Sequence, residues 1–236
     1  MQIIKDQDFI VAETPDTATP VDLVTTGGLD AWQDAQGAPA ARWAKASGFR
    51  AATDQVLPVP GPDGGLARVA MGVGDGLAVE GDPWAFARLA GAVPAGCYRV
   101  ADDLSPAAAY HAALGWALGQ YRFTRYRDCT KNGDLRQLVA PAGADMARIG
   151  RMIRAATMVR DLINTPTNDM GPDELESAMR EVADVCGAQM QAVTGDALLE
   201  RNFPLIHAVG RASDRAPRLL VLTWGDAEAT SVRLVG

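Results

Sequence analysis

Short apolar runs and longer amphipathic stretches alternate along the first part of the chain. Apolar runs of about four to eight residues that end at turn-forming residues are typical of strands. They predict strands at Phe9–Ala12, Val21–Thr25, Gln55–Val59, Leu66–Val73 and Cys97–Val100. Between the third and fourth runs, the segment Gly61-Pro62-Asp63-Gly64-Gly65 has the composition of a hairpin turn.

Capping residues mark three helices in the same region. Ala38–Ser47 ends at Gly48, a residue suited to the left-handed turn that follows a helix. Asp82-Pro83 and Ser105-Pro106 each place a capping oxygen before a proline at the first helical position. The second of these pairs predicts a helix over Pro106–Gly119. Its apolar face consists of Tyr110, Leu114 and Leu118.

The longest amphipathic pattern begins at about Asp145. Apolar residues recur there at helical spacing, so we expect one long helix with its arginines facing solvent. The apolar stripe contains Ile149, Ile153, Ala156 and Ile163, and the arginines are Arg148, Arg151 and Arg154. The polar segment from Asn164 to Gly171 predicts a loop after this helix.

The remaining pattern predicts one more long helix and three strands. The helix begins at Pro172 and stops at Gly187, and its apolar residues recur at 4-3-4 spacing. We expect these apolar residues to be buried: Leu175, Met179, Val182 and Cys186. Further elements are predicted as strands at Gln189–Val193, Arg218–Trp224 and Val232–Val235, and as a short helix at Asp196–Arg201.

Strands that alternate with helices indicate an α/β fold. We expect an N-terminal α/β domain over residues 1–135, in which helices flank a mixed sheet. A connecting helix over residues 136–165 then leads into the beginning of a second α/β/α sheet domain, residues 166–236. The boundary is placed near the polar stretch Asp128–Asp134 or within the following helix, because composition offers no clearer linker.

Composition narrows the possible classes of function. The chain has 236 residues, of which 48% are hydrophobic and 22% charged, as in an ordinary soluble globular protein. Its net charge of −7 argues against a nucleic-acid or membrane-surface protein, since both need a concentrated basic face. Widely spaced Cys97, Cys129 and Cys186 signal neither a disulfide framework nor a zinc site, which fits a reducing cytoplasm. Neither a secretory signal nor a membrane span is recognisable.

Two motifs resemble binding elements but have simpler explanations. The glycines of Gly72-Val73-Gly74-Asp75-Gly76 follow a strand, yet they lack dinucleotide-loop spacing and the next helix does not follow directly. We interpret them as a structural turn. Tyr121-Arg122-Phe123-Thr124-Arg125-Tyr126-Arg127 interleaves arginines with aromatic residues, as single-stranded nucleic-acid sites do. Because the chain is acidic, we interpret this segment as an amphipathic exit from the preceding helix.

The histidines and acidic residues form no convincing active site. His111 flanks an apolar stripe and is interpreted as structural, and no second metal ligand lies near His207 in sequence. The acids Asp173, Glu174 and Glu176 lie in the first turn of a helix, where they offset the helix dipole. Asp226 and Glu228 lie between the last two predicted strands and are interpreted as keeping that turn solvated.

The second half of the chain resembles the cytosolic leucyl aminopeptidase (M17) family. The resemblance rests on Val159-Arg160-Asp161-Leu162-Ile163-Asn164-Thr165-Pro166-Thr167-Asn168, followed by Gly171-Pro172 and an acidic helix. It continues in Phe203–Ser213 and in Ala216-Pro217-Arg218-Leu219-Leu220, in the family's order and spacing. The segment Gly115–Phe123 is similar to the end of the family's more variable N-terminal domain.

The resemblance implies a two-domain α/β protein that assembles as a hexamer and removes N-terminal residues from peptides. It further implies two divalent metals, commonly manganese, zinc or magnesium, held by carboxylates and a lysine. These metals bind the free amine, polarise the scissile carbonyl and activate the attacking water. The resemblance also implies that a bound bicarbonate, assisted by an arginine, acts as the base.

The family's metal-site segment follows a strand that corresponds here to Val232-Arg233-Leu234-Val235-Gly236. The sequence ends at this strand, so the resemblance transfers no catalytic, cofactor-binding or metal-binding residue to it. We therefore expect the 236-residue chain alone to be inactive and to bind no metal tightly. Because a half-built sheet leaves the apolar stripe of the Asp145–Ile163 helix and the edge Val232–Val235 uncovered, we also expect self-association or partial disorder after about Asp145. The alternative is a non-catalytic α/β module for oligomer contacts or DNA binding, with a basic stripe formed by the Tyr121–Arg127 arginines, Arg136 and Arg99.

Overall fold

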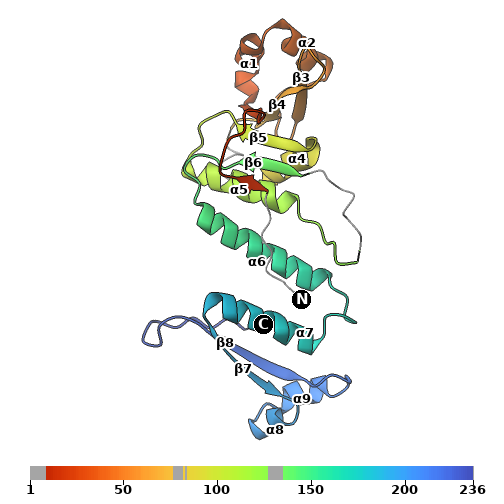
Figure 1. The fold of residues 1–236 in the computed structure, drawn as a ribbon, viewed down its shortest axis with the longest axis vertical. Helices are drawn as coiled ribbons and strands as arrows, with labels where there is room; N and C mark the ends of the chain where they lie inside the picture. Colours follow the sequence, from red (N-terminus) through yellow and green to blue (C-terminus); the bar gives the residue numbers. More distant parts are fainter. Residues whose placement is uncertain (1–8, 77–81, 83, 127–134, 236) are drawn as a thin grey trace. The chain divides into compact units, whose positions relative to one another are not determined.

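The computed structural model describes residues 9–76, 82, 84–126 and 135–235 (Figure 1). By internal packing the chain divides into two compact units, with the division between Thr157 and Met158. The first unit ends at residue 157, and the second extends from residue 158 to the end. The stretch Asp128–Asp134, one of the two places where the sequence suggested a boundary, lies outside the described residues.

The first unit is built on a six-stranded mixed sheet in the order β1-β6-β5-β2-β4-β3. Neighbouring strands are parallel, except that β3 and β4 form an antiparallel hairpin. The Gly61 amide donates to the Gly65 carbonyl over 2.7 Å in this hairpin, which confirms the predicted turn. The strands are β1 (Ile10–Val11), β2 (Thr19–Val24), β3 (Val56–Pro60), β4 (Leu66–Gly72), β5 (Gly96–Val100) and β6 (Arg136–Val139).

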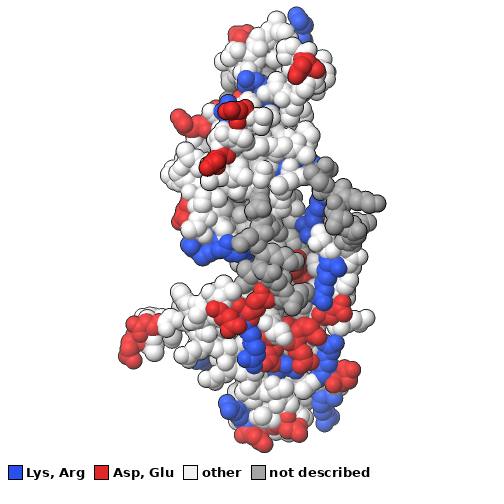
Figure 2. All heavy atoms as spheres, viewed as in Figure 1, with Lys and Arg blue, Asp and Glu red and all other residues white. Residues whose placement is uncertain are grey.

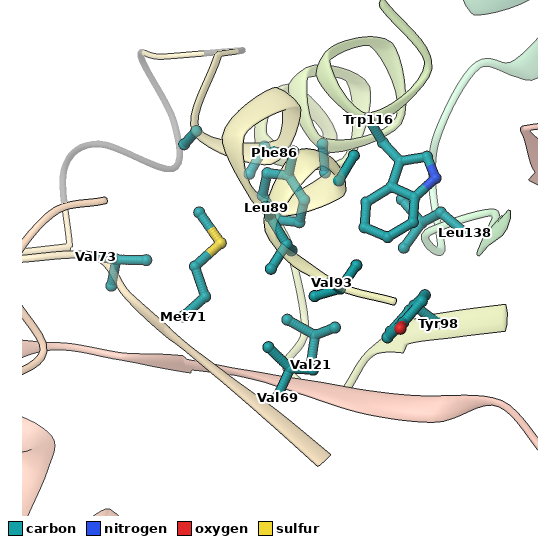
Figure 3. Packing of buried hydrophobic residues seen from close by; sticks show 14 residues of the cluster. Val21, Val69, Met71, Val73, Phe86, Leu89, Val93, Tyr98, Trp116 and Leu138 are labelled. Carbon is teal, nitrogen blue, oxygen red and sulfur yellow. The ribbon is translucent and has the colours of Figure 1, made fainter. Parts of the chain in front are cut away.

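Side-chain alternation along the strands gives this sheet two apolar faces. Val21, Val69 and Met71 point toward one face, which is covered by α4 (Trp84–Ala92) and α5 (Pro106–Gly119) (Figure 3). On the other face, Val24 and Ala70 pack with residues of α1 (Leu29–Gln36) and α2 (Ala38–Ala46). The first unit thus has a helix–sheet–helix core.

Helix α5 has apolar residues on all of its sides, and other elements cover it from several directions. Trp116 packs into the sheet core, whereas Ala113 and Leu114 pack against Ile149 and Ile153 of α6 (Met146–Asn164). The helix has its predicted bounds, and the Ser105 hydroxyl caps it by accepting the Ala108 amide at 3.2 Å. At Gly119 an added Cβ would lie 2.6 Å from the Cα of Ala87 in α4, so only glycine permits this close helix crossing.

Two elements of the first unit differ from the sequence prediction. The pattern did not predict α1, whose apolar contribution to the core is limited to Leu29 and Trp32. The predicted connecting helix over residues 136–165 is wrong in its first part, because Arg136–Val139 forms β6 and the helix begins at Met146. Pairing of β6 with both β5 and β1 decides this segment, and such distant partners are invisible to local periodicity.

The second unit packs a helix against a pair of antiparallel strands. Helix α7 (Pro172–Cys186) contacts β7 (Gln189–Thr194) and β8 (Arg218–Thr223), whose register pairs Gln189 with Thr223 and Thr194 with Arg218. Between the two strands lie the short helices α8 (Ala197–Glu200) and α9 (Pro204–Gly210). Gly210 fits because an added Cβ there would lie only 2.2 Å from the Cβ of Pro217.

The predicted buried stripes are only partly correct. On α7 the buried residues are Ala178 and Ala183, because these small side chains let the helix approach the strands closely, whereas Leu175 is 49% exposed. Cys186 is also exposed, and Met179 and Val182 are half-buried. On α6, Ile149 and Ile153 are buried as predicted, but Ile163 is 76% exposed.

The predicted strand Val232–Val235 is absent: these residues have no regular structure and their apolar side chains are exposed. A strand needs a hydrogen-bonded neighbour, and no described residue pairs with this segment. None of the described helices combines the length and apolar character that a membrane crossing requires.

Candidate functional site

A polar pocket of about 520 Å³ lies within the second unit. One wall is the loop that follows α6, and the other is the turn between α9 and β8. It is lined by Thr167, Asn168, Met170, Gly171, Pro172, Ser213, Asp214 and Arg215. The loop that follows the family-like Asn-Thr-Pro motif therefore forms one wall of this pocket.

The local sequence explains the shape of the loop wall. Helix α6 ends at Asn164 because the residue before a proline is disfavoured in helical conformation, and Pro166 follows Thr165. Buried Thr165 donates its hydroxyl to the Asp161 carbonyl at 2.7 Å, which closes the last turn. The Asp169 amide then donates to the Pro166 carbonyl at 2.9 Å and forms a turn that leads to α7.

Arg215 joins the two walls of the pocket. Its guanidinium contacts the Glu174 carboxylate, and its Nη2 donates to the Asn168 carbonyl at 3.1 Å. The same Glu174 oxygen accepts the Gly171 amide at 2.9 Å, so Glu174 also caps the start of α7. The backbone amide of Arg215 donates to the Ser213 hydroxyl at 3.1 Å, which fixes the turn on its own side.

A second arginine ties β8 to the same end of α7. The Arg218 guanidinium contacts both Glu176 and Asp173, and its Nη2 donates to the Ala216 carbonyl at 3.2 Å. Glu176 also accepts from Arg180, one helical turn further along α7, with its Nε at 3.1 Å. Figure 2 shows this intermixing of acidic and basic side chains over the second unit.

These contacts stabilise the ionised carboxylates. The Gly171 amide and the Arg215 guanidinium hold the pKa of Glu174 below its usual range. Hydrogen bonds from Arg180 and Arg218 lower the pKa of Glu176 in the same way. The sequence interpretation assigned these acids to the helix dipole, and the structure adds arginine partners about 40 residues away.

The arginines leave these acids poorly suited to hold metal ions. A two-metal centre needs several converging carboxylates that are free to ligate. In the described part of the chain, no group of three or more histidine, cysteine, aspartate or glutamate side chains is arranged to hold a metal. The described residues therefore do not fit a two-metal centre. The carboxylates beside the pocket instead form ion pairs with arginines.

Neither histidine is among the residues that line this pocket. The ring of His111 packs against that of Tyr110, with centroids 5.6 Å apart, in agreement with a structural role. His207 on α9 lies 3.1 Å from Asp196, a carboxylate that the sequence interpretation did not pair with it. One carboxylate and one imidazole form a surface contact rather than a metal site.

The glycine-rich turn after β4 is explained by close packing. An added Cβ at Gly72 would lie 2.2 Å from the Ala52 carbonyl oxygen, and one at Gly74 would lie 2.5 Å from the Thr53 hydroxyl. Both glycines therefore let the backbone of residues 51–53 lie against the turn. This observation agrees with the structural interpretation of residues 72–76.

Two described arginines of the basic stripe in the alternative hypothesis, Arg136 and Arg125, contact neighbouring groups of the same chain. Arg136 donates its Nε to the Val93 carbonyl at 2.6 Å, and its own carbonyl accepts from Trp116 and Gln120. Arg136 thus helps to fix the start of β6. Arg125 lies over the ring of Tyr126 at 5.5 Å, while Arg127 lies outside the described residues.

The last acids considered from the sequence also have a local role. Asp226 accepts the Glu228 amide at 3.0 Å in the turn after β8, so its carboxylate serves the turn itself. Sequence reasoning missed Arg215 and Arg218 as organising residues. The available signal was their position within two residues of Pro217, which cannot reveal partners on α7.

The fold thus defines an α/β protein of two compact units, a six-stranded mixed-sheet unit followed by an α7–β7–β8 unit tied by arginines. Residues 19–141 match the family model described as M17 aminopeptidase, N-terminal domain. Residues 157–236 match the model described as cytosol aminopeptidase family, catalytic domain. The chain belongs to the M17 cytosol aminopeptidase family, as the sequence resemblance predicted.

Sequence relatives cover most of this chain but only part of their own length. A protein of Leifsonia xyli named "Probable cytosol aminopeptidase" is 33% identical over 207 residues, which are 81% of this chain and 41% of the relative. A protein of the same name from Mycobacterium sp. strain JLS is 30% identical over 67% of this chain and 34% of the relative. The chain thus spans about two-fifths or less of these relatives.

Solved structures show the same relationship. The crystal structure of cytosol aminopeptidase from Coxiella burnetii has a TM-score of 0.84 and 34% identity, and covers 94% of this chain and 48% of that one. The bottromycin maturation enzyme BotP in complex with Mn has a TM-score of 0.68 and 25% identity, and covers 90% of this chain and 46% of BotP. The comparisons give no support to the alternative of a non-catalytic module.

Proposed function

We propose that this chain contributes the N-terminal domain, the connecting helix and the first part of the catalytic domain to a metal-dependent aminopeptidase. Such an enzyme releases N-terminal amino acids from peptides. The observation that carries the proposal is that the two family models match in order, over residues 19–141 and 157–236. A TM-score of 0.84 to the Coxiella burnetii enzyme over 94% of the chain supports it.

In this proposal the described residues have structural tasks. The first unit is a packed domain, and the ion-paired pocket of the second unit fixes the loop at the start of the catalytic domain. We assign no catalytic, cofactor-binding or metal-binding role to these residues, because the carboxylates at the pocket are engaged by arginines.

The proposed metal ions, substrates, assembly and location are those of the family. Two divalent ions are proposed for the complete enzyme, with manganese, zinc and magnesium as candidates, and the manganese complex of BotP supports metal use. Peptides are the proposed substrates, and a homo-oligomer, a hexamer as the family resemblance implies, is the proposed assembly. A cytoplasmic location is proposed because the relatives are named cytosol aminopeptidases.

The test compares two proteins. The first is the 236-residue chain, and the second is this chain extended by the part of the Leifsonia xyli relative that follows the aligned region. With manganese added, hydrolysis of a leucine anilide is expected from the extended protein and not from the 236-residue chain. Chelator should abolish the hydrolysis.

Each protein can contradict a different part of the proposal. A folded extended protein without turnover would argue against the aminopeptidase function. Turnover together with stoichiometric manganese binding by the 236-residue chain would show that its own residues form the metal centre.

A further inference from the structure

The pocket of the second unit is crossed by one side chain, and the contact requires a glycine. Arg215 starts on the turn wall and reaches the loop wall, where it contacts Glu174 and the Asn168 carbonyl. An added Cβ at Gly171 would lie 2.3 Å from Nη1 of Arg215 and 2.9 Å from its Cδ. The missing side chain of Gly171 therefore provides the slot in which the guanidinium lies.

We propose that Arg215 is a releasable strap that holds the two walls of the pocket together and that the pocket opens when Arg215 leaves the Gly171 slot. The proposal rests on the geometry of the second unit alone and is independent of the proposed peptidase function. The wall residues that it joins are Asn168 and Gly171 on one side and Ser213 and Asp214 on the other.

The contact between Arg215 and Glu174 is exposed enough to break easily. The side chains of Arg215 and Glu174 are 31% and 39% exposed, so water competes with their ion pair. Ion pairs at such exposure contribute little net stability. By contrast, Arg218, beside the same end of α7, is only 9% exposed and contacts two acids. Arg218 thus serves as the permanent tie of β8 to α7, and Arg215 as the movable one.

The fork of the guanidinium is essential to this role. Nη1 contacts Glu174 while Nη2 donates to the Asn168 carbonyl, so one planar group reaches two partners. A lysine ammonium keeps the charge but presents a single nitrogen, which cannot occupy both positions. Lysine at position 215 should therefore not replace the strap.

Hydrogen exchange of the 236-residue chain, measured by mass spectrometry, tests the proposal. Arg215→Met removes the guanidinium. Gly171→Ala keeps the guanidinium but fills the slot, and the φ of −103° at position 171 is one that alanine adopts without backbone strain. Both variants should accelerate amide exchange in residues 165–171 and in residues 211–215 by about three- to tenfold, the effect of losing an exposed ion pair with its hydrogen bonds. Arg215→Lys should give the same result.

The matched control is Asp184→Asn, an exposed carboxylate on the same helix outside the arginine contacts. It should leave exchange in both walls unchanged, and strands β7 and β8 should keep their protection in every variant. Acceleration of only one wall, or wild-type exchange in Arg215→Lys, would overturn the strap. Uniform acceleration that includes β7 and β8 would also overturn it, because Arg215 would then support the whole unit.

Discussion

The two units of this chain differ in the interactions that stabilise each of them internally. Of the ten largest fully buried side chains in the described residues, nine belong to the first unit and only Leu198 to the second. The second unit instead carries strongly exposed apolar residues, such as Leu205 at 79% and Val209 at 83%, beside a network of arginine–carboxylate contacts. The first unit is thus stabilised by apolar burial, whereas ion pairs and hydrogen bonds have a larger share in the second.

The largest loss of stability is expected from a substitution in the apolar core of the first unit. Phe86 on α4 is fully buried against the sheet. Phe86→Ala should lower the free energy of unfolding of this unit by about 3–5 kcal/mol, because it leaves a cavity. Urea denaturation followed by circular dichroism measures the change. Leu205→Ala on exposed α9 is the control and should change stability by less than about 0.5 kcal/mol; equal losses would remove the contrast between the units.

An ion pair between a buried carboxylate and a partly exposed arginine of the first unit should have the next largest effect. Asp22 on β2 accepts from Nη1 of Arg68 at 2.7 Å and from Nε1 of Trp32 at 2.8 Å. Asp22→Ala removes the acceptor of both donors, which should cost about 1–3 kcal/mol. The thermal unfolding temperature provides the measurement. Asp34→Ala, at an exposed position of α1, should have almost no effect, and a similar loss there would argue against the ion pair as the cause.

The exposed apolar surface of the second unit predicts self-association of the 236-residue chain. Sedimentation velocity should show species that increase with protein concentration, because exposed apolar area is removed from water on association. The double substitution Leu205→Ser and Val209→Ser should weaken association by roughly tenfold, as expected for removing apolar surface. Leu135→Ser, at an exposed apolar position of the first unit, should not; a monomer at all concentrations would contradict the prediction.

The smallest expected effect is the pH dependence of the second unit. Glu176 has a pKa below its usual range because Arg180 and Arg218 donate to it. The stabilisation is therefore present above the unfolded carboxyl pKa of about 4.3 and is lost as the pH falls through the lower pKa of the folded protein. Glu176→Gln should reduce the loss of β7 and β8 exchange protection between neutral and acidic pH. Asp184→Asn should keep the wild-type profile, and an unchanged profile in Glu176→Gln would exclude this carboxylate as the source.

Local sequence predicts most elements of the first unit because local and tertiary preferences agree there. The Ser105-Pro106 start and the apolar run that follows predict α5 within its observed bounds, since capping and burial favour the same helix. Prediction fails at β6, where a four-residue strand depends on pairing with β5 and β1. In the second unit, periodicity selected the Leu175 face of α7, whereas contact with the strands buries Ala178 and Ala183.

The pocket of the second unit also depends on contacts that local sequence does not predict. The sequence indicated a loop from Asn164 to Gly171 and an acidic first turn in α7, both from local residue types. It gave no sign that Arg215 and Arg218 reach those acids, because the ion pairs join residues 41 and 42 positions apart. The need for glycine at position 171 likewise appears only when the guanidinium lies above it.

The α/β class, the long helices with their caps and the family could all be predicted from the sequence, because each depends on patterns of neighbouring residues. The tertiary structure decided which helix faces are buried, which short segment becomes an internal strand and which arginine neutralises which acid. The physical reason is that burial, strand pairing and ion pairing are properties of contacts between distant residues. Local periodicity constrains these contacts but does not select among them.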